Sequence, residues 1–119
     1  MASHTDPDPR DLLPLKPRWF HILLALADGA MHGYAIRHAV EERTGGALKM
    51  WPATLYGSIR ELSEQGAIEP LEDEADAADD QRRRYYRLTP RGRELLRSEA
   101  ERLQALVHAA YTSRALGEA

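Results

Sequence analysis

Apolar residues recur every three or four positions in the first half of this chain, which is the spacing of one face of an α-helix. Leu55, Ile59 and Leu62 follow this spacing, so we expect them to form the buried face of a helix. A glycine follows each periodic segment and favours a helix end there. The pattern predicts three helices, over residues 17–27, 32–44 and 52–65.

Two short strands are predicted after the third helix, over residues 67–71 and 83–88, with an acidic loop between them. The second strand combines arginine with tyrosine, and tyrosine favours strands. Alternate residues of a hairpin strand share a face, which gives two sets: Arg83, Tyr85 and Arg87, and Arg82, Arg84 and Tyr86. One tyrosine can pack on the helical core while the arginines opposite face the solvent. The pattern leaves open which set faces outward.

The last predicted helix begins after Thr89, a good N-cap, and continues to about residue 116. At about 1.5 Å per residue it would be about 39 Å long, too long to pack only on the body of one domain. Its apolar residues form a seam that repeats every seven positions: Leu96, Ala100, Leu103, Val107 and Ala110. We therefore expect a homodimer joined along this seam, and packing on the protein's own core is the alternative.

These elements predict a mainly α fold with a small two-stranded β-wing, a winged helix-turn-helix followed by a long C-terminal dimerisation helix. At 119 residues the chain fits one such domain. We expect a flexible N-terminal arm over residues 1–15, the winged helix-turn-helix over residues 16–89 and the dimerisation helix over residues 90–119.

The formal net charge is −3, but the charges are segregated along the chain. Residues 69–80 hold seven acids and no base, whereas residues 82–87 hold four arginines and no acid. Local patches, rather than the net charge, set the field that a phosphate meets. A basic segment of this kind is therefore compatible with a nucleic-acid partner.

The chain contains no cysteine, which excludes disulfides and thiolate metal sites and fits a reducing compartment. No apolar run approaches the roughly 20 residues that a membrane span needs. The N-terminal residues have no apolar block, so we expect no secretory signal there. We expect a cytoplasmic protein.

The third helix is a candidate surface for reading nucleic acid. With its apolar face buried, the residues turned outward are Ala53, Thr54, Gly57, Arg60 and Glu61, with Tyr56 and Ser58 on the flanks. Small residues allow close approach to a groove floor, Arg60 can donate to guanine or phosphate, and hydroxyl groups can bind phosphate oxygens. The alternative is an ordinary amphipathic surface helix, and Glu61 is a mild objection to DNA binding.

The arginines of the second strand are a second candidate contact with phosphates, although they can instead balance the neighbouring acidic loop. We expect that loop, residues 72–80, to be mobile and solvated. The alternative is that its carboxylates screen the arginines until DNA or a ligand displaces the loop. It lacks the spaced ligands and the glycine of a calcium loop.

The five histidines show no metal-ligand spacing, and no catalytic or nucleotide-binding motif is present. We expect no metal, no cofactor and no enzymatic activity.

Four short segments carry a more specific pattern. They are residues 31–36 (MHGYAI), 53–59 (ATLYGSI), 62–68 (LSEQGAI) and 83–92 (RRYYRLTPRG). In this order and spacing they resemble the PadR family of bacterial transcriptional regulators, over about residues 17–98. The segments correspond in turn to the opening of the helix-turn-helix, the recognition helix, the turn into the wing and the exit from the wing. The sequence departs from the family where Ala53 replaces a frequent glycine, and where the wing tip is longer and more acidic than usual.

The resemblance implies a homodimeric repressor of the short subclass, which binds a palindromic operator and is released by a small aromatic or hydrophobic effector. With the helical wheel, it places eight residues at the DNA: Tyr34, Thr54, Tyr56, Gly57, Ser58, Arg60, Arg84 and Arg87. Candidate aromatic residues of an effector pocket are Trp19, Phe20, Trp51 and Tyr111, for which plain core or dimer packing is the alternative. A winged helix that contacts proteins without an operator, and a repressor without an effector, are the rival functions.

Overall fold

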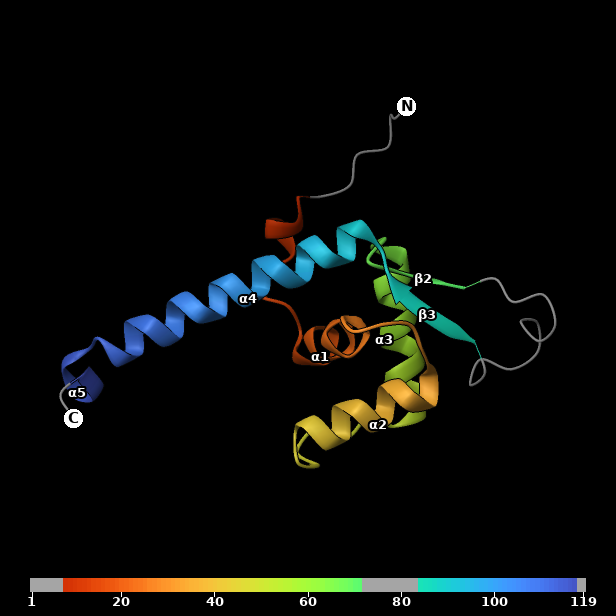
Figure 1. Cartoon of the computed structure of the whole chain (residues 1–119), viewed down its shortest axis with the longest axis horizontal. Coiled ribbons are helices and arrows are strands. Elements are labelled where there is room, and N and C mark those ends of the chain that lie inside the picture. The colour runs from red at the N-terminus through yellow and green to blue at the C-terminus, as the bar shows by residue number, and fades with distance from the viewer. Residues whose placement is uncertain (1–7, 72–83, 118–119) are drawn as a thin grey trace.

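The computed structural model describes residues 8–71 and 84–117 (Figure 1). Its helices are η1 (Pro9–Leu12), α1 (Pro17–Leu26), α2 (Gly33–Arg43), α3 (Pro52–Glu64), α4 (Pro90–Tyr111) and α5 (Arg114–Gly117). Its strands are β1 (Met31–His32), β2 (Ile68–Pro70) and β3 (Tyr85–Leu88). The predicted order of three helices, two wing strands and a long helix is confirmed. The acidic loop over residues 72–80 lies outside the described residues.

The sheet has three strands rather than the two predicted. β3 is central and pairs antiparallel with β2 on one side and with β1 on the other. In the β1 pairing, Met31 lies opposite Tyr86 and His32 opposite Tyr85. A two-residue strand has no periodicity of its own, and its partner lies more than fifty residues away, so the sequence pattern does not reveal it.

The core lies where α1, α2, α3, the sheet and the first turns of α4 meet. Leu55, Ile59 and Leu62 are buried, as the spacing along α3 predicts. Tyr86 from β3 and Leu95 from α4 close the core from the other side. Among the helices of the described ranges, none combines the length and apolar character that crossing a membrane requires.

The N-terminal segment differs from the flexible arm that we expected over residues 1–15. From Asp8 onward it is ordered: η1 packs against α4, and Leu15 is buried with only 6% of its surface exposed. Leu12 and Leu13 are partly buried against the core. These leucines give the segment an apolar side that packs against α4. The local sequence pattern does not predict this packing. Residues 1–7 lie outside the described part of the chain.

The last helix is interrupted before residue 116, where we expected it to end. α4 stops at Tyr111, and a short α5 follows. The Thr112 hydroxyl donates to the Ala109 carbonyl at 3.1 Å and the Ser113 hydroxyl to the Ala110 carbonyl at 2.6 Å. Such local bonds compete with the helical pattern and favour the break. The second half of α4 extends beyond the rest of the described chain (Figure 1), and Val107 on it is 54% exposed.

Candidate nucleic-acid interface

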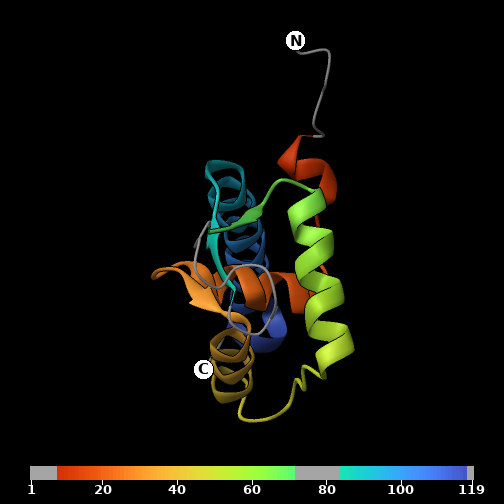
Figure 2. The ribbon, with the colours of Figure 1, turned by 90° about the vertical axis from the view of Figure 1, so that its right-hand side faces the viewer.

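α3 lies along one side of the molecule (Figure 2), and its outward residues form an exposed strip. Ala53, Thr54 and Arg60 are exposed, and Gly57 is partly exposed. No atom lies within 4 Å of the position that a Cβ on Gly57 would occupy, so the middle of the strip is unobstructed. The strip therefore combines small residues with a hydroxyl and a guanidinium, as the helical wheel predicts.

Ser58 differs from the other residues of this set because its side chain is buried, with 1% exposed. It lies between the outward strip and the apolar face, at the side where α1 packs on α3. Its Oγ has no hydrogen-bond partner among the described residues. The periodicity put Ser58 on a flank of α3, whereas in the folded chain its side chain is buried.

One edge of α3 contacts the start of α2. A side chain at Gly33 would meet the far end of the Tyr56 ring, so the ring would have to shift to make room for it. The next residue, Tyr34, is 50% exposed beside this contact. His32 caps α2, because its Nδ1 accepts a hydrogen bond from the Ala35 N–H at 3.2 Å. The predicted DNA-face residues Tyr34 and Tyr56 thus share one edge of the strip.

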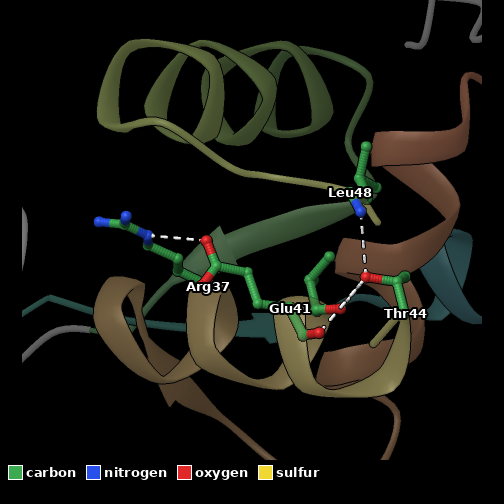
Figure 3. A network of polar contacts seen from close by, with 5 residues as sticks. Arg37, Glu41, Thr44 and Leu48 are labelled. Atoms are coloured by element: carbon green, nitrogen blue, oxygen red, sulfur yellow. Dashed lines mark hydrogen bonds and ion pairs between the residues drawn. The ribbon is translucent and has the colours of Figure 1, made fainter. Parts of the chain in front are cut away.

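The turn from α2 to α3 is held by polar contacts, shown in Figure 3. Thr44 Oγ1 donates to the Val40 carbonyl at 3.0 Å and accepts from the Leu48 N–H at 3.2 Å. On the same helix Arg37 pairs with Glu41 at 3.2 Å. The Thr44 bonds connect the end of α2 to the start of the loop that leads to α3.

The opposite edge of α3 faces the start of α1 across an open groove of about 350 Å³. Its lining residues are Arg18, Ala53, Thr54, Gly57, Ser58 and Glu61. Trp19 Nε1 donates to Glu61 Oε1 at 2.8 Å, and Lys16 Nζ lies 3.6 Å from the same oxygen. The Trp19 hydrogen bond, followed by the nearby Lys16 and Arg18 charges, holds the pKa of Glu61 below its usual range. Glu61 is therefore a fixed negative charge at this edge.

Lys16 and Arg18 were not among the residues that the sequence pattern singled out. The sequence does show two basic residues that flank Pro17 at a predicted helix start, and this could have marked them as a basic site. The sequence does not predict that this helix start lies beside the outward strip of α3.

The wing presents the face that carries Tyr85 and Arg87. Tyr86 is buried at 4% exposure, whereas Tyr85 is 44% exposed. Arg87 is exposed, but its Nε donates to Glu69 Oε2 at 2.7 Å, so part of its charge is compensated. Arg84 is half-buried. Arg82 and Arg83 lie outside the described residues.

The four aromatic residues predicted for an effector pocket are not brought together. Trp19 is buried and bonded to Glu61, and Phe20 is partly buried, with its ring edge-on to His21. Trp51 is 61% exposed at the start of α3, where the Arg37 guanidinium lies 6.0 Å from its ring centre. Tyr111 is 65% exposed at the end of α4. No group of three or more His, Asp or Glu residues in the described ranges is arranged to hold a metal ion.

Comparisons with known proteins agree with this arrangement. The model of the transcriptional regulator PadR-like family matches residues 22–98. A 37.1 kDa protein in transposon TN4556 of Streptomyces fradiae is 41% identical over 85 residues, which is 71% of this chain and 22% of that protein. This chain therefore spans about a fifth of that relative's length.

Two solved structures are informative. PadR of Bacillus subtilis in complex with operator DNA superposes with a TM-score of 0.59 at 22% identity, covering 71% of this chain and 47% of that one. BpsR of Bordetella bronchiseptica, whose DNA binding is regulated by 6-hydroxynicotinic acid, superposes with a TM-score of 0.61 at 26% identity. That match covers 90% of this chain and 70% of BpsR.

Proposed function

This chain belongs to the PadR-like family of transcriptional regulators, and from that premise we propose that it is a repressor that binds its operator through α3. The observation that carries the proposal is the outward strip of α3, where Thr54 and Arg60 stand beside the small residues Ala53 and Gly57. Small residues let the helix approach the floor of the major groove, and Arg60 can donate to a guanine edge. The proposal includes no enzymatic activity, and DNA as the partner implies action in the cytoplasm.

We propose that two copies act together on a palindromic operator. The support is the exposed half of α4: Val107 and Ala110 of the seam that repeats every seven positions are exposed, and Leu103 is partly exposed. Leu106, next to the seam, is also 55% exposed. An apolar helix side of this length gains stability when a second copy covers it. A two-fold dimer would place two α3 helices about one turn of DNA, or roughly 34 Å, apart.

We also propose that a small aromatic or hydrophobic effector releases the DNA. The likeness to BpsR, a protein regulated by 6-hydroxynicotinic acid, supports this part of the proposal. Of the four candidate aromatic residues, Tyr111 lies on the helix that the second copy would cover. A pocket between the two copies would therefore be lined by residues near the end of α4. Heat stability of the protein in the presence of a broad panel of aromatic compounds tests this part, and no shift with any compound would contradict it.

A mobility shift with the DNA directly upstream of the protein's own coding sequence tests operator binding. We expect a discrete complex that a scrambled duplex of equal length competes for only weakly. The affinity should fall steeply with salt, because phosphate contacts release counterions. Absence of binding to any duplex at low salt would contradict the proposal and favour a winged helix that contacts proteins instead.

A further inference from the structure

We propose that Lys16 and Arg18, at the start of α1, bind the sugar-phosphate backbone of duplex DNA along the edge of α3 that faces away from α2. The inference rests on the proposed function, because it adds a phosphate-binding edge to the same interface. The sugar-phosphate backbone is the one part of DNA that presents negative charge at every position, whatever the sequence.

The position of Arg18 is the first support. Arg18 lines the groove together with Thr54, Gly57 and Ser58, so it borders the strip that would enter the major groove. A groove that presents a guanidinium and a threonine hydroxyl suits a ligand that carries oxygen atoms better than an apolar one.

The dimensions of DNA supply the second argument. The major groove is about 12 Å wide and a helix with its side chains is about 10–12 Å across, so a helix in the groove has a phosphate strand on each side. Tyr56 and Thr54 lie on opposite flanks of α3. The Tyr56 flank meets α2 at Gly33, and the Thr54 flank meets Arg18 across the groove. The start of α1 therefore stands where the second phosphate strand would pass.

The local charges agree with a phosphate ligand. Lys16 precedes α1 as its N-cap without a side-chain cap, and the first turn carries no acid. The Lys16 side chain is 48% exposed, and its ammonium lies 4.9 Å from the centre of the Trp19 ring. The positive end of the α1 dipole adds to the two side-chain charges at this place.

Glu61 opposes these cations in the free protein. Its carboxylate is held by the Trp19 indole and lies 3.6 Å from Lys16 Nζ, so it shields the lysine until a phosphate competes for it. Glu61 thus lowers the affinity for DNA. Because the amide oxygen introduced by Glu61→Gln can still accept the indole bond, this substitution removes the charge and keeps the contact.

The test is fluorescence anisotropy on two labelled duplexes, the operator and a scrambled sequence, between about 50 and 200 mM salt. Arg18→Ala and Lys16→Ala should weaken binding by the same factor on both duplexes. Each should make the slope of log affinity against log salt shallower by about 0.9. Glu61→Gln should bind both duplexes several-fold more tightly.

Two further variants serve as controls. Arg18→Lys keeps the charge and should keep the slope of the unmodified protein. Arg97→Ala removes an exposed arginine of α4 that lines a different groove, with Arg91 and Glu94, and should change neither affinity nor slope. Circular dichroism of every variant checks that the fold is retained.

The outcomes separate this inference from the function on which it rests. If the unmodified protein binds but Arg18→Ala and Lys16→Ala match its affinity and slope, the inference is wrong and the proposed function stands. A loss confined to the operator duplex, with an unchanged slope, would also overturn it, because that pattern marks base reading. An unmodified protein that binds no duplex refutes both.

Discussion

The backbone N–H of Leu15 donates a hydrogen bond of 3.2 Å to Oε2 of Glu99, which lies 84 residues further along the chain. Glu99 is buried, with 2% exposed, and Arg102 donates to both of its oxygens, from Nε at 2.6 Å and from Nη2 at 2.8 Å. The bond ties the segment that leads into α1 to the middle of α4. This buried carboxylate therefore adds a polar contact between the two segments to the apolar packing of α4 on the core.

Glu99→Gln should lower the free energy of unfolding by about 1–3 kcal/mol at pH 7, because hydrogen bonds to a charged group are lost. The Arg102 hydrogen bonds, and then the Leu15 N–H, hold the pKa of Glu99 below its usual range against the opposing effect of burial. The stabilisation is thus full above the unfolded pKa of about 4.3 and is lost as the pH falls through the lower folded value.

Urea unfolding of the unmodified protein and of Glu99→Gln, from pH 7 down to about pH 3, measures this effect. The difference between the two should shrink at the acid end. Glu101→Gln, an exposed neighbour on α4, is the control and should stay within about 0.5 kcal/mol of the unmodified protein. A difference that is constant with pH would contradict a role for the ionised carboxylate.

Gly92→Ala should destabilise the fold by about 1–3 kcal/mol or more. A Cβ at Gly92 would overlap the backbone carbonyl oxygen of Ala67, and backbone cannot move aside as a flexible side chain can. Thermal unfolding measures the loss. Gly57→Ala is the matched control: it meets no atom within 4 Å, and alanine favours a helix interior by about 1 kcal/mol. Equal stability of the two variants would show that the fold does not need the close approach of α4 to Ala67.

Arg60→Ala should weaken operator binding by about 1–3 kcal/mol and relax the preference at one base pair, if Arg60 reads a base. The exposed position of Arg60 on the outward strip of α3 supports this expectation. Binding to a set of operators, each with one base pair changed, measures it. Equal weakening on every sequence would limit Arg60 to a phosphate contact.

Val107→Glu should convert the proposed dimer into a monomer, because a buried charge in an apolar seam lacks a partner. Val107 is 54% exposed in the single chain, so the substitution leaves the fold of each copy intact. Light scattering after size exclusion measures the mass, and operator affinity should fall with it. Ala105→Glu introduces the same side chain on the opposite side of α4 and should stay dimeric. A tight-binding monomer would contradict the two-copy model of operator binding.

Local features of the sequence were enough to predict most elements. The spacing of Leu55, Ile59 and Leu62 gave the buried face of α3, and with it the exposed strip opposite. Thr89 before Pro90 located the start of α4, where the Thr89 hydroxyl accepts from the Gly92 N–H at 3.0 Å. These signals work because helix periodicity and capping involve residues within four positions of one another.

Contacts between distant segments could not be predicted in this way. The pairing of Met31 with Tyr86 adds a third strand, and the ion pair with Glu69 shows which acid compensates part of the Arg87 charge. The burial of Ser58 and the place of Arg18 beside α3 both depend on how α1 packs. Periodicity and composition do not identify which residues are partners in these contacts.

The sequence by itself determined the three helices before the wing, the two wing strands, the start of α4 and which side of α3 is apolar, because those properties depend on neighbours a few residues away. The tertiary structure alone decided which basic groups border that helix and how the N-terminal segment is attached to α4. Those features require chain segments tens of residues apart to meet in a packed core, and only the folded chain brings them together.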